Sequence, residues 1–279
     1  MLWNSKGLSN RHIMNSLPLV SVVIPTYNSE RTLAKCLESI KNQIYKNVEA
    51  IVVDNYSKDK TVEIAKRYGA KIIKKKCNKP EARNIGILIL KGDYILLLDS
   101  DMMLEKEVVE EGVAKFYNEG CDALFINEEY LDDGFLKKCR NLEKIVYREN
   151  PIIEAPRFYK KSLALKTFFD DRNEGPDEYD FYISLQSRFS LKESRINSKL
   201  ILLEPPINLK KKFHHGKFFM YYRRKHKNKA IPSKQINFHY RIKILLRAFR
   251  ISPLHFFRII FHKISRLYSF FIRNHLWLF

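Results

Sequence analysis

The sequence predicts an α/β protein: a doubly wound, mainly parallel sheet with a basic, amphipathic helical appendage in its C-terminal part. Two observations predict this fold class. Short runs of β-branched and aliphatic residues alternate with amphipathic segments between residues 20 and 127. The last quarter of the chain instead combines aromatic residues with a strong positive charge.

We expect the strands where short apolar runs suit burial on both faces of a parallel sheet. These runs cover 20–25, 48–53, 70–73, 94–98 and 123–127. Alternation of such strands with helices predicts right-handed crossovers between parallel neighbours.

Helices are expected between these strands. Asn28 or Ser29 can cap the first one, in which Leu33, Leu37, Ile40 and Ile44 form an apolar stripe. The others are expected at about 59–68, 82–90 and 105–117.

Length and composition are those of a globular protein. Of 279 residues, 45% are hydrophobic and 29% are charged, which excludes wholesale disorder and a polytopic membrane protein.

The cysteines (Cys36, Cys77, Cys121 and Cys139) form no CxxC pair, so we expect a reducing compartment and no disulfide framework or zinc site. Residues 1–17 hold no apolar run long enough for a secretory core, which predicts the cytosol.

The positive charge is concentrated in one region. Residues 206–279 carry 18 of the 51 Lys and Arg residues and none of the 31 Asp and Glu residues. Nearly all of the net charge of +20 therefore belongs to this region, and the rest of the chain is close to neutral. We predict an N-terminal extension over 1–17, a catalytic domain over 18–205 and a basic aromatic region over 206–279.

Polar residues follow three of the predicted strands: 26–28, 54–55 and 99–101. Ligands of such sheets bind beyond the carboxyl ends of the strands. Asp99 and Asp101 flank one residue at a strand end, where carboxylates can hold a hard cation such as Mg²⁺ or Mn²⁺ together with substrate phosphates. The alternative is a solvated turn in which Asp101 caps a helix.

Four motifs carry a resemblance to a known family. They lie at 22–28, 52–61, 82–86 and 98–101. In this order and spacing the segment resembles the family-two glycosyltransferases with the GT-A fold, and a weaker match continues to about Leu185. The resemblance implies a mixed, mainly parallel sheet. The family's acidic acceptor-side motif is represented by 175–181, with the order of its first two acids reversed.

The resemblance implies transfer of a sugar from a nucleotide diphosphate sugar to an acceptor, with inversion at the anomeric carbon. It favours a UDP-sugar, with a GDP-sugar as the alternative. By position, Asp54 would accept the N3–H of uracil or the N1–H and N2–H of guanine. Arg83 would approach the diphosphate or the base. The implied nucleotide-sugar-binding residues are Pro25, Tyr27, Asn28, Asp54, Arg83, Asp99 and Ser100. The implied metal ligands for Mg²⁺ or Mn²⁺ are Asp101, Asp99 and His214. Asp99 can instead face the ribose, and His214 can belong to a solvated or membrane-facing basic surface.

A hydroxyl acceptor must lose a proton as it attacks, so the reaction needs a base. Glu178 falls where the family's base lies, Asp177 is the alternative, and Asp180 is more simply a helix-start acid. A lipid phosphate acceptor is already ionised and would need no base.

Several of these residues also have structural interpretations. Asn28 can cap its helix, Arg83 can be a surface residue, and Gly86 is expected to permit close packing of helix and sheet. Ser57 and Thr61 are expected in turn and capping positions.

Residues 237–279 predict attachment to a membrane surface. In 241–251 and 254–273 the basic and aromatic residues fall on opposite helix faces, which suits the interface of an anionic membrane. Every 20-residue window contains several charges, so neither segment can span a bilayer. We therefore expect a peripheral enzyme on the cytoplasmic face of the cell membrane, with a polyprenyl phosphate, lipid-linked oligosaccharide or glycolipid acceptor.

Other uses of these features remain open. The apolar faces of the last segments can instead pack on the protein's own core or form a homo-oligomer. They argue against nucleic acid as the partner. A non-catalytic membrane scaffold and a nucleotidyltransferase of similar fold are the alternative functions.

Overall fold

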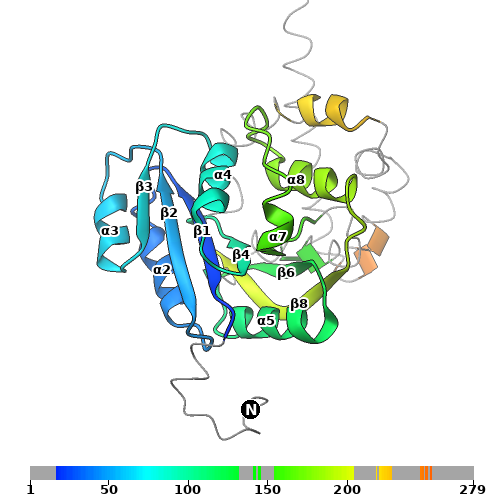
Figure 1. Cartoon of the computed structure of the whole chain (residues 1–279), viewed down its shortest axis with the longest axis horizontal. Helices are drawn as coiled ribbons and strands as arrows, with labels where there is room; N and C mark the ends of the chain where they lie inside the picture. Colours follow the sequence, from blue (N-terminus) through cyan, green and yellow to red (C-terminus); the bar gives the residue numbers. More distant parts are fainter. Residues whose placement is uncertain are drawn as a thin grey trace, which may run out of the picture.

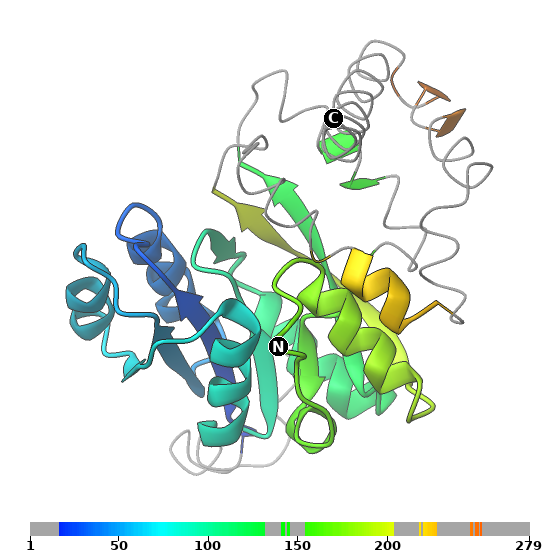
Figure 2. The ribbon, with the colours of Figure 1, turned by 90° about the horizontal axis from the view of Figure 1, so that it is seen from above.

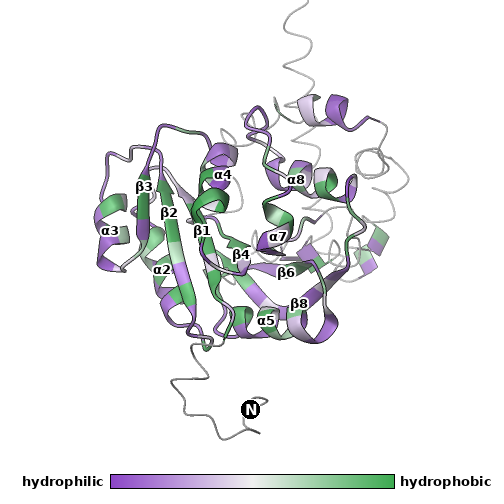
Figure 3. Cartoon of the chain, viewed as in Figure 1, coloured by the Kyte–Doolittle hydropathy of each residue, from purple (hydrophilic) through white to green (hydrophobic). Residues whose placement is uncertain are grey.

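Four parallel strands form the N-terminal half of the sheet (Figure 1). In this computed structural model, β1 (Val20–Thr26) pairs with both β2 (Val48–Asp54) and β4 (Tyr94–Leu97), and β2 pairs with β3 (Lys71–Lys74). The central strands are buried on both faces, as their apolar runs predicted. Figure 3 colours much of β1 and part of β2 as hydrophobic.

The other half of the sheet is mixed. It contains β5 (Met102–Leu104), β6 (Ala123–Tyr130), β7 (Phe158–Lys160) and β8 (Glu193–Leu202). The sheet order is β3-β2-β1-β4-β7-β6-β8-β5, with β7 antiparallel to both β4 and β6. The sequence did not predict β5, β7 or β8, because two are only three residues long and β8 lacks a continuous apolar run.

Helices cover both faces of the sheet, which confirms the doubly wound architecture. One face packs on α2 (Leu33–Lys41), α3 (Thr61–Arg67) and α5 (Val108–Glu119). The other packs on α4 (Lys79–Ile89), α7 (Lys161–Ala164) and α8 (Asp177–Gln186). Successive residues of β1 alternate between the two cores, with Val22 in the first and Val23 in the second. The layers are seen from above in Figure 2.

Two helix starts differ from the prediction. The prediction that Asn28 or Ser29 caps α2 is wrong, because Thr32 occupies the cap position and Asn28 bonds to another loop. The apolar stripe predicted for α2 ends before Ile44, because Ile44 lies beyond the helix and is exposed. Helix α4 begins at Lys79, three residues before the predicted start, where Asn78 Oδ1 accepts the N–H of Glu81 at 3.0 Å.

The structure describes residues 17–131, 141–142, 144–145, 154–203, 218, 220–227, 246–247, 249–250 and 252. The predictions for 1–16, for His214 and for most of 237–279 therefore lie outside the described residues. Within the described ones, no helix combines the length and the apolar character that crossing a bilayer would require.

Candidate active site

A cleft of about 1150 Å³ opens at the carboxyl ends of β1 and β4. It lies where the sequence predicted a ligand site, beyond the ends of parallel strands. The predicted site residues that line it are Pro25, Tyr27, Asn28, Asp99, Ser100 and Asp101. Four cationic residues that the sequence analysis did not select also line it: Arg31, Lys35, Lys76 and Lys79.

Asp54 lies at the end of β2 and is fully buried. Its Oδ1 accepts hydrogen bonds from Thr26 Oγ1 (3.0 Å) and Ser57 Oγ (2.5 Å), and its Oδ2 accepts one from the N–H of Ser57 (3.0 Å). These bonds fix the turn that follows β2. The predicted turn role of Ser57 is confirmed, whereas base binding by Asp54 stays a prediction.

The loops after β1 and β2 hold one another. The N–H of Asn28 donates to Ser57 Oγ at 2.8 Å, and Asn28 Oδ1 accepts the N–H of Lys58 at 2.9 Å. The N–H of Ser29 donates to Thr61 Oγ1 at 2.7 Å. Asn28 has a φ of 50°, a left-handed conformation that asparagine tolerates better than most residues. These bonds place the exposed ring of Tyr27 on the wall of the cleft.

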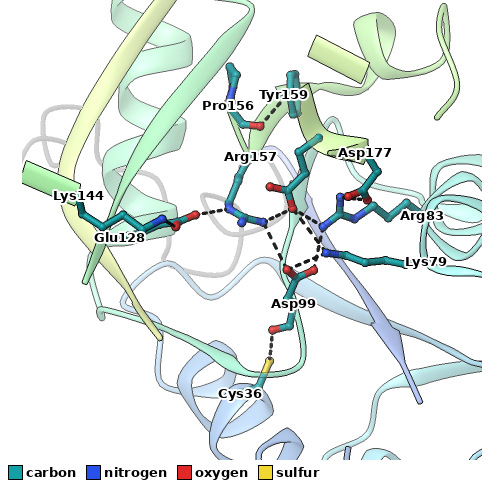
Figure 4. Close-up of polar contacts among 11 residues, drawn as sticks. Cys36, Lys79, Arg83, Asp99, Glu128, Lys144, Pro156, Arg157, Tyr159 and Asp177 are labelled. Atoms are coloured by element: carbon teal, nitrogen blue, oxygen red, sulfur yellow. Dashed lines mark hydrogen bonds and ion pairs between the residues drawn. The ribbon is translucent and has the colours of Figure 1, made fainter. Parts of the chain in front are cut away.

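Arg83 is fully buried at the floor of the site, so it is not the surface residue of the alternative interpretation. Its Nη1 donates to Asp177 Oδ2 at 2.6 Å, and its Nη2 donates to Asp99 Oδ1 at 2.8 Å and to Glu178 Oε1 (Figure 4). The guanidinium also lies 5.3 Å from the centre of the Phe169 ring. Arg83 therefore joins α4, α8 and the end of β4.

Lys79 lies one helical turn before Arg83 and adds a second cation to the same carboxylates. Its Nζ donates to Asp99 Oδ2 at 3.0 Å and lies 3.9 Å from Glu178 Oε1. Both oxygens of Asp99 therefore face a cation. Burial would raise the pKa of Asp99, but Lys79, Arg83 and the nearby Arg157 lower it well below its ordinary value. The four-residue spacing of Lys79 and Arg83 is a sequence signal that could have identified Lys79.

Asp177 and Glu178 begin α8, and their surroundings differ. Burial raises the pKa of Asp177, although Arg83 opposes the rise, and its side chain is only 4% exposed. Burial would also raise the pKa of Glu178, but Arg157, Arg83 and Lys79 lower it, and its side chain is 17% exposed. Of the two, Glu178 is the more accessible and the more firmly ionised.

Asp180 faces away from this cluster. Its Oδ2 accepts a hydrogen bond from Lys225 Nζ at 2.8 Å, and its Oδ1 lies 2.5 Å from His226 Nε2. Asp180 is buried and attaches residues 220–227 to α8, which agrees with the structural interpretation of this acid.

Two further charged residues of the site were not indicated by the sequence. They are Arg157, which precedes β7, and Glu128 on β6.

The donor set for a divalent cation is small. Asp99 and Asp101 both line the cleft, and the oxygens of Asp99 are paired with Arg83 and Lys79. His214 lies outside the described residues. Among the described residues, no three His, Cys, Asp or Glu side chains gather as a metal site. One carboxylate completed by substrate phosphates is nevertheless a common way to hold Mg²⁺, so Asp101 fits such an ion.

Comparison with known protein families gives an independent result. The model of the family described as "Glycosyl transferase family 2" matches residues 21–169, which is more than half of the chain. Glycosyltransferase GlyG of Streptococcus pneumoniae is 31% identical over 123 residues, 42% of this chain and 41% of GlyG. An uncharacterised glycosyltransferase of Rickettsia typhi is 31% identical over 197 residues, 70% of this chain and 52% of that protein. The matches to EpsE of Bacillus subtilis, GlyG and GlyA of S. pneumoniae span 39%, 41% and 14% of those curated relatives.

Two solved structures have the same fold. The TarS 1-349 structure of S. aureus in complex with UDP-GlcNAc has a TM-score of 0.61 at 19% identity, covering 85% of this chain and 74% of that one. Glucosyl-3-phosphoglycerate synthase of Mycobacterium tuberculosis, in complex with Mn²⁺, UDP and phosphoglyceric acid, has a TM-score of 0.55 at 18% identity, covering 77% and 81%. The mixed sheet is thus that of the GT-A glycosyltransferases. Together with the family match, this means that the chain belongs to glycosyltransferase family 2.

Proposed function

We propose that this glycosyltransferase uses a UDP-sugar and transfers the sugar, with inversion, to a membrane-borne acceptor. The observation that carries the proposal is the cleft at the ends of β1 and β4, which Asp99 and Asp101 line. Asp99 shares the guanidinium of Arg83 with Glu178. The solved structure of TarS with UDP-GlcNAc supports a uridine donor, and GDP-sugars are the alternative to be tested.

The nucleoside would lie against the loop after β1. Tyr27 offers an exposed aromatic face on the cleft wall, suited to stack on a base. Asp54 supports this loop from behind through Thr26 and Ser57. Direct capture of the uracil N3–H by Asp54 would require its carboxylate to become accessible, so we propose that its first role is to hold the loop.

The diphosphate would lie near the end of β4. Asp101 would hold Mg²⁺ or Mn²⁺, which would supply positive charge to the leaving diphosphate. Lys79 and Arg83 would add fixed positive charge at the same place, although their carboxylate partners reduce it. Asp99 would act mainly as the residue that orients these two cations.

Glu178 is our candidate for the base. It is the more exposed of the two acids at the start of α8, and Arg83, Arg157 and Lys79 keep it ionised at neutral pH. Glu178 lies next to Lys79, which lines the cleft, and its carboxylate would accept the proton of an acceptor hydroxyl as the sugar is transferred. Asp177 would instead hold Arg83 in place.

The acceptor and the location are proposed from charge. The basic aromatic region over 206–279, and 237–279 in particular, has the composition of a segment that binds anionic lipid, so an acceptor carried by the membrane would be presented to the cleft. Co-sedimentation of the full chain with phosphatidylglycerol vesicles tests this, and reversal of charge at Arg258 and Arg266 should weaken it. Equal binding to vesicles of zwitterionic phosphatidylcholine, which has no net charge, would contradict it.

Calorimetric titration with UDP and with GDP, in Mn²⁺ and in chelator, tests the donor site. We expect UDP to bind in Mn²⁺ and binding to be lost in Asp101→Asn. Asp122→Asn is the control, because Asp122 precedes β6 at the opposite edge of the sheet and pairs with Lys160. Failure of the folded wild type to bind either nucleotide would contradict the proposed function.

A further inference from the structure

Arg157 links the candidate base to the sheet. It immediately precedes β7, and its Nη1 donates to Glu178 Oε1 at 2.7 Å while its Nε donates to Glu128 Oε1 at 2.8 Å (Figure 4). The same Nη1 lies 4.0 Å from Asp99 Oδ2. One guanidinium thus spans the carboxylates of α8 and β6 and approaches the one that follows β4.

The backbone of Arg157 is fixed on both sides. Its N–H donates to the carbonyl of Leu124 in β6 at 3.2 Å, and its carbonyl accepts the N–H of Leu97 in β4 at 2.8 Å. The residue therefore bridges two strands at the point where the sheet changes from parallel to antiparallel. Its side chain is almost fully buried, which leaves the guanidinium little freedom to move.

Glu128 fixes the other end of this guanidinium. Glu128 also forms an ion pair with Lys144, so a single carboxylate lies between two cations. Burial would raise the pKa of Glu128, but Lys144 and Arg157 lower it to about 2, so it remains ionised at neutral pH. Arg157 therefore has a permanent anionic partner that does not take part in the proposed chemistry.

We propose that Arg157, held by Glu128, is a positioning residue that fixes the carboxylate of Glu178 for proton acceptance. The inference rests on the proposed function of Glu178 as the base. Three cations converge on Oε1 of Glu178, whereas its Oε2 has no hydrogen-bond partner in the described part of the chain. Arg157 thus holds one oxygen and leaves the other for the acceptor.

The length of the side chain explains why such a restraint is needed. The glutamate at position 178 has one more rotatable bond than an aspartate, and side chains with more bonds lose more entropy when they are fixed. Arg83 approaches Glu178 from α4 and Arg157 approaches it from the sheet. Two guanidinium groups on separate rigid elements restrict the carboxylate more than either would alone.

The charged and titratable groups around Glu178 come from several elements. They are Lys79 and Arg83 of α4, Asp99 after β4, Glu128 of β6, Arg157, Tyr159 of β7, and Asp177 and Tyr179 of α8. Arg157 is the most influential of the cations that lower the pKa of Glu178. Its removal should therefore raise that pKa.

The test measures release of UDP from UDP-N-acetylglucosamine and UDP-glucose, with water or an added acceptor lipid, as a function of pH. In Arg157→Gln we expect kcat to fall by on the order of tenfold or more. The KM for the donor should change by less than about twofold, because Arg157 is not among the residues that line the cleft. The acid limb of the plot of kcat against pH should move to higher pH. Arg157→Lys should keep the limb near that of the wild type. Glu128→Gln should lower kcat, because Arg157 loses its anionic partner. It should not move the limb to higher pH, because loss of a nearby anion does not raise the pKa of a carboxyl.

Arg195→Gln is the matched control. Arg195 of β8 also donates to a neighbouring side chain, Asn127 Oδ1 at 3.0 Å, forms an ion pair with Glu154 and packs on the ring of Phe125, but it lies outside the site. The Arg195→Gln variant should have a lower Tm than the wild type, but the acid limb of its plot of kcat against pH should not move. An unchanged limb in folded Arg157→Gln, or a rate loss that appears only in KM, would overturn the inference.

A second measurement needs no turnover. In a double-mutant cycle of Arg157→Gln and Glu178→Gln, the loss of Tm in the double variant should be smaller than the sum of the two single losses. Additive losses would overturn the inference even if the donor is not turned over. Loss of UDP binding by the wild type would instead contradict the proposed function, so the two failures are distinguishable.

Discussion

Gly86 of α4 packs directly on Val23 of β1. A Cβ placed on Gly86 would lie 2.2 Å from Cγ1 of Val23, which is far inside van der Waals contact. The helix can approach the strand this closely only without a side chain at this position. Since α4 also carries Lys79 and Arg83, the contact sets the distance of both cations from the end of β4.

Gly86→Ala should therefore destabilise the protein and disturb the site. Overpacking of a core costs about 1–3 kcal/mol, and the displaced helix should weaken binding of UDP. Leu88→Ala is the control, because Leu88 lies on the same helix with 65% of its surface exposed. Urea denaturation measures the difference in the free energy of unfolding, and a Gly86→Ala variant as stable as the wild type would contradict the packing argument.

Asp99 and Asp101 should differ in what they contribute. Asp99→Asn removes the charge that faces buried Arg83 and Lys79, and should lower the free energy of unfolding by about 1–3 kcal/mol at pH 7. Asp101→Asn should cost less stability but should abolish the Mn²⁺-dependent part of UDP binding. Urea denaturation and calorimetry of both variants check this. If Asp101→Asn lowered the free energy of unfolding more than Asp99→Asn, Asp99 would not hold the two cations.

The location of the site could be predicted from the sequence, because the strands that carry it are continuous apolar runs. The ends of β1 and β4 follow from where those runs stop, and the polar residues after them line the cleft. The packing role of Gly86 was also predicted and is confirmed. These features depend on local periodicity and on short motifs, which a single sequence displays.

The charged network could not be predicted, because its partners are distant in the chain. Arg157 and Glu178 are 21 residues apart, and Arg83 and Glu178 are 95 residues apart. Arg157 precedes a strand of only three residues, which has no periodic signal. Capping of α2 was one of the roles predicted for Asn28, but its side chain accepts the N–H of Lys58 instead. In each case tertiary contacts decide which local option is used.

The attachment of residues 220–227 should depend on pH through Asp170. Burial would raise the pKa of Asp170, but hydrogen bonds from Arg172, Lys225 and Tyr221 lower it below its ordinary value of 3.8. A carboxyl with a lowered pKa in the folded state contributes stability above its ordinary pKa, and the contribution is lost as pH falls through the folded value. Acid should therefore weaken the attachment of this segment to Asp170, which accepts hydrogen bonds from Tyr221 and Lys225.

Hydrogen exchange of residues 220–227 between pH 7 and pH 2 measures this loss. In Asp170→Asn we expect faster exchange at pH 7, equivalent to about 1–3 kcal/mol of lost protection, and a smaller change with pH than in the wild type. Asp171→Asn is the control, because that side chain is exposed and has no ion pair among the residues that the structure describes. Equal exchange in all three proteins would contradict a role for Asp170.

Tyr56 occupies a strained position beside the cleft. Its φ is 50°, and a bulky residue in this left-handed region pays about 1–2 kcal/mol that glycine does not. The conformation is imposed by its neighbours, since the N–H of Ser57 is bonded to Asp54. The ring is 57% exposed, so its removal should lose little packing energy.

Tyr56→Gly should therefore be at least as stable as the wild type, and more stable than Tyr56→Ala. Alanine keeps the Cβ and its strain, whereas glycine relieves the strain but gains freedom in the unfolded chain. The difference between these two variants should be about 0.5–1 kcal/mol in the free energy of unfolding. Urea denaturation of the pair measures it, and both should bind UDP alike if the strain only shapes the turn. If Tyr56→Ala proves the more stable of the two, the turn after β2 is not under strain at this residue.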